Sequence, residues 1–160
     1  MKKKILITLI IVVVIVAVVL AVMFIPRNSK NIQINIQDLA SKIAESGSFE
    51  DQLMQVDSEM VMEDYNFSSD EINELVSYQG SGATSEEIVI LQVKDKSQIN
   101  DVKSKIDTRL AERKEAFESY LPEEVGKIDN NILKVEGNYV ILCIANDTNT
   151  VNNVLNENIK

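Results

Sequence analysis

Two arginines in a predicted long helix are the residues whose types and spacing point most directly to a binding site. Residues 97–120 repeat apolar side chains at the spacing of one helical face. Arg113 falls inside this apolar stripe, and Arg109 lies at its edge next to Tyr120. Either the arginine stems cover the core while their guanidinium groups pair with acids, or Arg109, Arg113 and Tyr120 line a pocket that binds the carboxylate of a partner or ligand.

The composition excludes several kinds of catalytic site. The 160 residues contain no His and a single Cys, so a Ser–His–Asp triad, a Cys–His dyad, a His-ligated zinc site and an intrachain disulfide are ruled out. Cys143 lies in an apolar run, which is typical of a small buried residue. The S-x-x-K spacing of Ser–Lys hydrolases occurs nowhere. We therefore expect no enzyme activity and no cofactor.

The remaining polar motifs also favour structural roles. Glu86 and Glu87 are neighbours in a predicted strand, so their side chains point to opposite faces and cannot form an acid/base pair. The glycine-rich residues 80–85 precede a strand rather than a helix, which predicts a flexible hairpin loop and not a phosphate loop. Residues 64–70 alternate oxygen-bearing side chains like a calcium loop, but Ser69 replaces the required Gly and Leu75 the required Glu. We predict no metal site.

The N-terminal part predicts a membrane anchor. Residues 5–25 form an uncharged run of 21 residues, which as a helix is about 31 Å long and matches a bilayer core. Three lysines at positions 2–4 precede it, whereas Arg27 and Lys30 follow it. The positive-inside rule therefore predicts a cytoplasmic N-terminus. A cleaved signal peptide is the alternative, although the run is longer than a usual apolar signal region and lacks an A-x-A site.

The predicted organisation follows from this anchor: a cytoplasmic tail at 1–4, a transmembrane helix at 5–25, a linker at 26–34 and an extracytoplasmic domain at 35–160. Residues 31–160 carry 11 basic and 25 acidic residues, a net charge of −14. An acidic domain of this kind is not expected to bind nucleic acid. We expect a single-pass protein of the cell membrane whose partner is an envelope protein or a wall component.

The periodicity of the exposed part predicts an α+β fold. A nearly continuous apolar run at 87–94 indicates a central strand, and Gly137–Asn138 separates two apolar runs as a hairpin turn does. Two hairpins joined by one long helix predict a four-stranded antiparallel sheet with that helix and shorter helices packed on one face. The expected strands are 75–79, 87–94, 132–135 and 139–145, and the expected helices are 35–47, 58–65, 97–120 and 148–159.

One group of residues resembles a known family. It comprises the pattern E-x-I-V-I-L-x-x-x-D at 86–95, Arg109, Phe117, Tyr120-x-Pro122 and the hairpin at 135–142. Over roughly residues 36–158 the chain is similar to the bacterial family called domain of unknown function four-three-five-eight. The resemblance implies an extracytoplasmic α+β domain, in small membrane-anchored proteins or lipoproteins of low-GC Gram-positive bacteria. It implies no activity and no catalytic residues, and this chain has an apolar segment where other members have a lipidated Cys.

Taken together, these features predict a non-enzymatic interaction module that is tethered in the cell envelope. The alternative is an envelope domain that binds a small ligand or a cation. No basic residue occurs between Lys42 and Lys94, and such an acidic stretch usually forms a solvated surface. The first six residues of the linker, 26–31, reach at most about 20 Å, so a partner should lie close to the bilayer.

Overall fold

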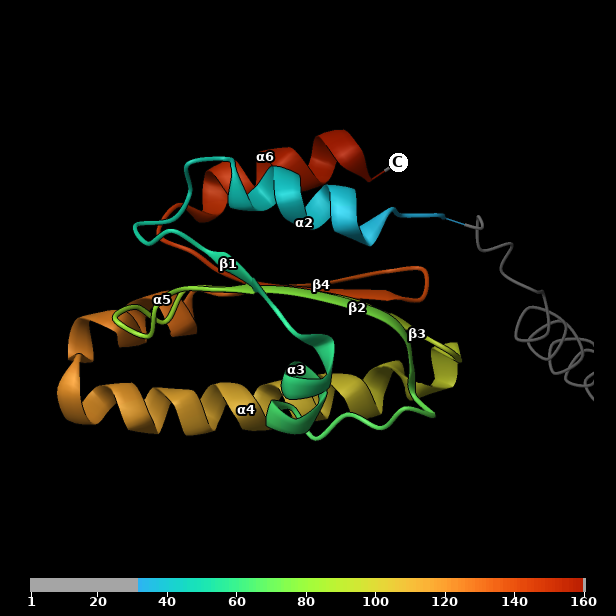
Figure 1. Ribbon diagram of the computed structural model, residues 1–160, viewed down its shortest axis with the longest axis horizontal. Helices are drawn as coiled ribbons and strands as arrows, with labels where there is room; N and C mark the ends of the chain where they lie inside the picture. The colour runs from blue at the N-terminus through green and yellow to red at the C-terminus, as the bar shows by residue number, and fades with distance from the viewer. Residues whose placement is uncertain (1–31, 160) are drawn as a thin grey trace, which may run out of the picture. The chain divides into compact units, whose positions relative to one another are not determined.

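The computed structural model describes residues 32–159, which form an α+β domain around one antiparallel sheet (Figure 1). The sheet has five strands in the order β1-β2-β3-β5-β4. The predicted α+β class and both predicted hairpins are therefore confirmed. The strands are β1 (Met54–Val56), β2 (Ile72–Gln79), β3 (Glu87–Val93), β4 (Ile132–Glu136) and β5 (Tyr139–Ile144).

The prediction of four strands was wrong, because β1 adds a fifth strand at the edge of the sheet. β1 has three residues, and Met54 and Gln55 are exposed. So short a segment with no buried face gives no alternating pattern, and its pairing with the end of β2 depends on residues more than 20 positions away. Strand β2 also begins three residues earlier than predicted, at Ile72.

Helices cover both faces of the sheet, whereas the sequence predicted packing on one face. Figure 1 shows α2 and α6 above the sheet and α3, α4 and α5 below it. The predicted long helix is confirmed, and it begins after a 3₁₀ turn, η1 (Lys96–Gln98), while a second 3₁₀ turn, η2 (Pro122–Glu124), follows it. The helices are α2 (Ile36–Ala44), α3 (Ser58–Asp64), α4 (Ile99–Tyr120), α5 (Val125–Asp129) and α6 (Thr148–Asn158).

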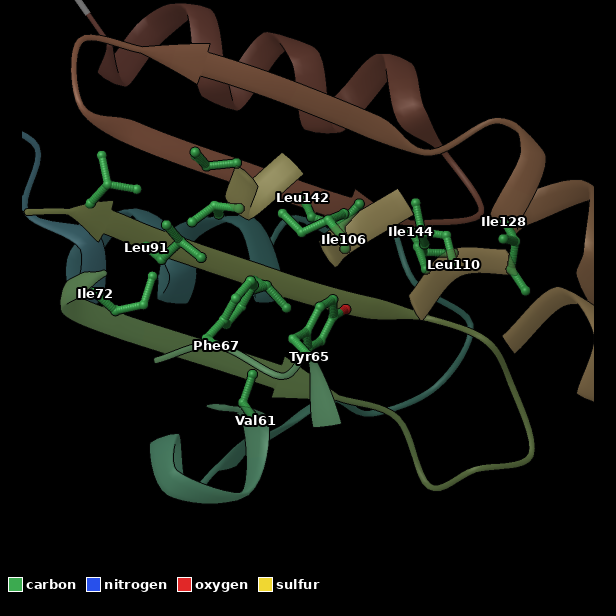
Figure 2. Close-up of a cluster of buried hydrophobic side chains, with 14 of the residues drawn as sticks. Val61, Tyr65, Phe67, Ile72, Leu91, Ile106, Leu110, Ile128, Leu142 and Ile144 are labelled. Carbon is green, nitrogen blue, oxygen red and sulfur yellow. The ribbon is translucent and has the colours of Figure 1, made fainter. Parts of the chain in front are cut away.

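The two helical layers create two apolar cores that share the central strands. On the α4 side, Leu91 and Leu142 pack against Ile106 of α4, as Figure 2 shows. On the other side, alternate residues of the same strands, such as Ile90 and Ile141, pack against α2 and α6. Strands β3 and β5 are buried on both faces, which explains why their sequences read as continuous apolar runs.

The predicted transmembrane helix at 5–25, the tail at 1–4 and the linker up to residue 31 lie outside the described residues. Between residues 32 and 159, none of the helices has the combination of length and apolar character that a bilayer-spanning segment needs. The boundaries proposed for the N-terminal segments therefore stay predictions.

The double-sided core makes a prediction about β3. Replacing Leu91 by Ala should lower the free energy of unfolding by about 2–5 kcal/mol, because the cavity lies between α4 and two paired strands and cannot collapse easily. Met60→Ala is the control, since Met60 on α3 is 61% exposed, and it should change stability by less than about 0.5 kcal/mol. Urea denaturation followed by circular dichroism measures both values. Equal losses would contradict a core centred on β3.

Candidate functional site

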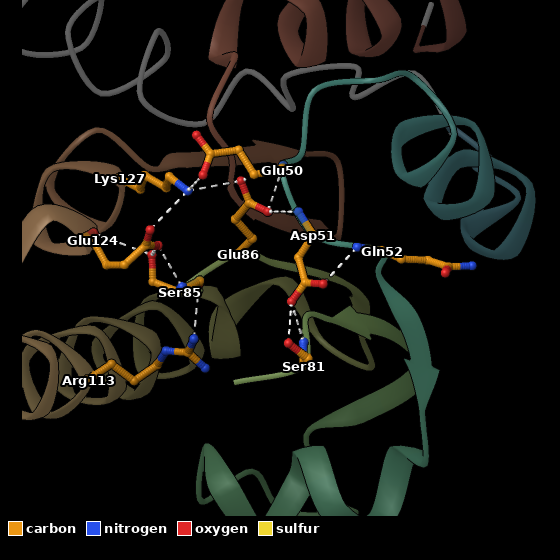
Figure 3. A network of polar contacts seen from close by, with 9 residues as sticks. All are labelled: Glu50, Asp51, Gln52, Ser81, Ser85, Glu86, Arg113, Glu124 and Lys127. Carbon is orange, nitrogen blue, oxygen red and sulfur yellow. Dashed lines mark hydrogen bonds and ion pairs between the residues drawn. The ribbon is translucent and has the colours of Figure 1, made fainter. Parts of the chain in front are cut away.

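The polar residues that lie deepest in the domain gather at the start of β3. Glu86 and Glu87 both have side chains with 0% exposure. Around them a set of charged and polar groups forms what we call the β3 carboxylate network, most of which Figure 3 shows. Its members come from the loop after α2, from the β2–β3 loop, from α4 and from the η2–α5 segment: Glu50, Asp51, Ser85, Glu86, Glu87, Arg113, Glu124 and Lys127.

Glu86 holds the loop that connects α2 to β1. Its two carboxylate oxygens accept hydrogen bonds from the backbone N–H of Glu50 at 3.0 and 2.9 Å, and one accepts from the backbone N–H of Asp51 at 2.9 Å. Lys127 donates to the other oxygen at 3.2 Å. These donors replace the hydrogen bonds to water that a buried carboxylate loses, so Glu86 ties the loop after α2 to α5.

Lys127 of α5 is the single cation among three carboxylates. Its Nζ lies 3.1 Å from Glu50, 3.2 Å from Glu86 and 3.1 Å from Glu124. Its side chain is 12% exposed. Burial lowers the pKa of Lys127, but the hydrogen bonds to the three carboxylates outweigh burial and raise the pKa above its ordinary value.

Glu124 connects this cation to the β2–β3 loop. Its carboxylate accepts from the backbone N–H of Ser85 at 2.8 Å and from the Ser85 hydroxyl at 3.0 Å. Burial raises the pKa of Glu124, whereas the hydrogen bonds from Ser85 and Lys127 lower it, and the net direction is downward. On the other side of the loop, Asp51 accepts from the N–H and the hydroxyl of Ser81. The predicted loop at 80–85 is thus tied down at two points.

Glu87, the first residue of β3, contacts a different set of groups from Glu86. It pairs with Arg113 Nη1 at 3.1 Å and accepts from Gln79 at 2.9 Å. Burial raises the pKa of Glu87, and the neighbouring guanidinium opposes this effect only in part. Arg113 also donates from Nη2 to the backbone oxygen of Ser85 at 3.0 Å, so it joins the two halves of the network.

The structure separates the three residues that the sequence placed in a candidate pocket. Arg113 pairs with buried Glu87, in agreement with the first interpretation of its position. Arg109 instead lies 3.5 Å from Asp64 and lines a cavity of about 210 Å³ that Arg113 and Tyr120 do not line. Tyr120 is 57% exposed and stacks on Phe117. A ligand-binding role for these residues stays a prediction.

Comparison with known protein families gives a match for the chain. The family model described as Domain of unknown function (DUF4358) matches residues 45–145. The chain belongs to this family. The resemblance seen in the sequence is therefore confirmed. No curated protein and no solved structure matches the chain.

The matched range of the DUF4358 domain contains the whole β3 carboxylate network, all five strands and α4. Sequence reasoning singled out Glu86, Glu87 and Arg113, but it missed Lys127 and Ser85 as members of the site. Neither stands out locally: Lys127 is the one lysine of a five-residue helix, and Ser85 is one of several serines in a loop or at its ends. Lys127 follows Glu86 by 41 residues, so only the tertiary fold reveals the pair.

Two larger hollows lie on the part of the chain that the structure describes. One, of about 440 Å³, lies beside the network and is lined by Glu50, Glu124 and Lys127 among others. The other, of about 1090 Å³, lies between the start of α2 and residues of β2, β3 and β5. Between residues 32 and 159 no group of three Asp, Glu or Cys side chains is arranged to hold a metal ion. Cys143 is fully buried, and burial raises its pKa to about 12, so it is a thiol at neutral pH.

The network predicts that replacing Lys127 lowers the stability of the fold more than replacing Lys114 does. Lys127→Met should lower the free energy of unfolding by about 3 kcal/mol, because Glu86 would stay buried without its counter-charge. Lys114→Met is the matched control: Lys114 lies 2.7 Å from Asp129 in a half-exposed pair, which contributes less than about 1 kcal/mol. Urea denaturation at neutral pH compares the two variants. A small and equal loss in both would show that the network does not stabilise the fold.

The lowered pKa of Glu124 predicts how the stability of the fold depends on pH. Its folded pKa lies below the ordinary value of 4.5, so its ionised form adds stability above that pH, and this contribution is lost as the pH falls through the lower folded pKa. The stability advantage of the wild type over Glu124→Gln should therefore be largest at neutral pH and shrink in acid. Glu123→Gln, at the exposed neighbouring position, should change stability little at neutral pH. An advantage that grew in acid would contradict the direction of the shift.

Proposed function

We propose that this DUF4358 protein is a single-pass membrane protein that presents its α+β domain outside the cytoplasm as a non-enzymatic interaction module of the cell envelope. The observation that carries the proposal is the uncharged run of 21 residues at 5–25, which lies between a lysine cluster and a strongly acidic chain. An isolated apolar segment of that length is stable in lipid as a helix. The lysines favour a cytoplasmic N-terminus.

The contacts of the described domain support a role in binding rather than catalysis. Most hydrogen bonds of the β3 carboxylate network join its members to one another and to backbone groups of the neighbouring loops, while buried Glu87 Oε2 and Arg113 Nε have no hydrogen-bond partner among the described residues. Glu86 alone accepts from two loop residues and from Lys127. Groups held in this way fix loops relative to the sheet, which is what a surface that recognises a partner requires.

The hollow of about 440 Å³ favours a second candidate function, the binding of a small cationic ligand. Glu50 and Glu124 of the network line it beside Lys127, and Glu123 adds a third acid to the lining. An organic ammonium group would reduce the excess of negative charge. A rise in melting temperature with such a ligand, at constant ionic strength and abolished in Glu123→Gln, would favour this function over the first.

The topology is tested directly in intact cells. With an epitope tag at the C-terminus, added protease should remove the tag, while a tag at the N-terminus should be protected until the cells are lysed. A known outward-facing protein and a cytosolic protein serve as the two controls. Protection of the C-terminal tag, under conditions that digest the outward-facing control, would invert the topology and remove the envelope function.

A further inference from the structure

Strand β2 has an open edge because β1 pairs with only its last three residues. Val56 of β1 lies opposite Ser77 of β2, and the pairing ends there. The chain then leaves the sheet at Asp57, which caps α3, and Figure 1 shows it crossing to the α4 side. Within the described part of the chain, Ile72 and residues 74–76 pair with β3 alone, and the Ile72 N–H also donates to the backbone oxygen of Ser68. In an antiparallel strand alternate residues direct their N–H and C=O groups to this free side.

A groove reaches the open edge from the α2 side of the sheet. It has a volume of about 1090 Å³, and residues 73–76 of β2 contribute to its lining together with residues 33–37 at the start of α2, Gln92 of β3 and Tyr139 of β5. Ser58 lies at the end of the groove where the chain leaves β1. Asn73 and Glu74 are exposed. A strand of five residues is about 17 Å long, and its backbone could pair with the free groups of β2 in line with β1.

The charge of this region indicates which kind of segment would pair with β2. Among the described residues that line the groove, Glu74 is the single charged one. The absence of Lys and Arg between Lys42 and Lys94 leaves β1, α3 and β2 without a positive charge. A basic side chain directly across from Glu74 would form a stabilising cross-strand pair. Two copies of this chain joined edge to edge would bring like charges together, which disfavours self-pairing.

We propose that residues 72–76 of β2 dock an extended, basic segment of a partner protein, which adds to the sheet as a further antiparallel strand. The inference rests on the proposed interaction function and names the partner's chemistry. Val76 packs with the α2-side core, whereas Leu75 packs with the α4-side core. The partner strand therefore alternates: its basic residues lie on the α2 side with Glu74, and apolar residues lie on the other side with Leu75.

The test uses the full chain in non-ionic detergent and a fluorescent octapeptide of alternating valine and lysine. Fluorescence anisotropy should show binding, and hydrogen exchange should show new protection of backbone amides within residues 73–76. A peptide of the same sequence with N-methylated valines should not bind, because it keeps the charge but loses strand donors. Glu74→Lys should weaken binding about tenfold. Glu118→Lys, an equal charge change on the exposed side of α4, should have little effect.

Three results would overturn the docking edge: no binding by the wild-type chain, equal binding of the N-methylated peptide, or binding without protection of residues 73–76. Equal weakening by Glu74→Lys and Glu118→Lys would also overturn it, because attraction would then come from overall charge. The tag-protection experiment is independent of β2. An outward-facing domain that fails the peptide test loses this docking edge and keeps the envelope function, whereas an inward-facing domain loses that function whatever the peptide does.

Discussion

The burial of two adjacent carboxylates at the start of the central strand is the constraint on which the rest of this domain depends. Removing a carboxylate from water costs several kcal/mol unless charges and donors replace the solvent. Glu86 obtains these from Lys127 and from the loop after α2, and Glu87 obtains them from Arg113 and Gln79. Burial of these two neighbouring residues thus requires α4, α5 and the loop after α2 to be in place together at one end of the sheet.

The need of Glu86 and Glu87 for charged and hydrogen-bonding partners explains why elements far apart in the sequence meet at one end of the sheet. Arg113 reaches Ser85 from α4, Glu124 reaches the same residue from η2, and Lys127 reaches Glu86 from α5. The turn after α4 is therefore constrained from both sides: Pro122 ends the helix, and the following residues must return to β3. Buried charges of this kind specify an arrangement more than they add stability, because each is costly outside its one correct setting.

The sequence allowed much of the fold to be predicted and less of the site. The stripe of α4, the continuous apolar run of β3 and the turn at Gly137, whose φ is +64°, are local patterns. Strand β1 and the pair Lys127–Glu86 are not local, because each depends on a partner that tertiary folding brings near. Arg113 lies between these cases: its place in an apolar stripe marked it as unusual, but the stripe could not identify Glu87 as its partner. The family model matches residues 45–145, a range that includes the β3 carboxylate network. It leaves out α2 and α6, which complete the second core.

The negative charge near the open edge of β2 opposes pairing between two copies of this chain. The same charge makes the edge selective for a basic partner. Exposed strand edges promote association unless charges, bulges or short lengths interrupt them. Strand β2 has a register shift between Ile72 and Glu74, and Glu74 is exposed on this edge strand. With a net charge of −14 over residues 31–160, approach of a second copy is repelled, whereas a basic segment is attracted before any contact forms. The negative charge of Glu74 disfavours pairing of β2 with an identical chain and favours pairing with a basic segment. The same residue therefore opposes self-association and selects the partner.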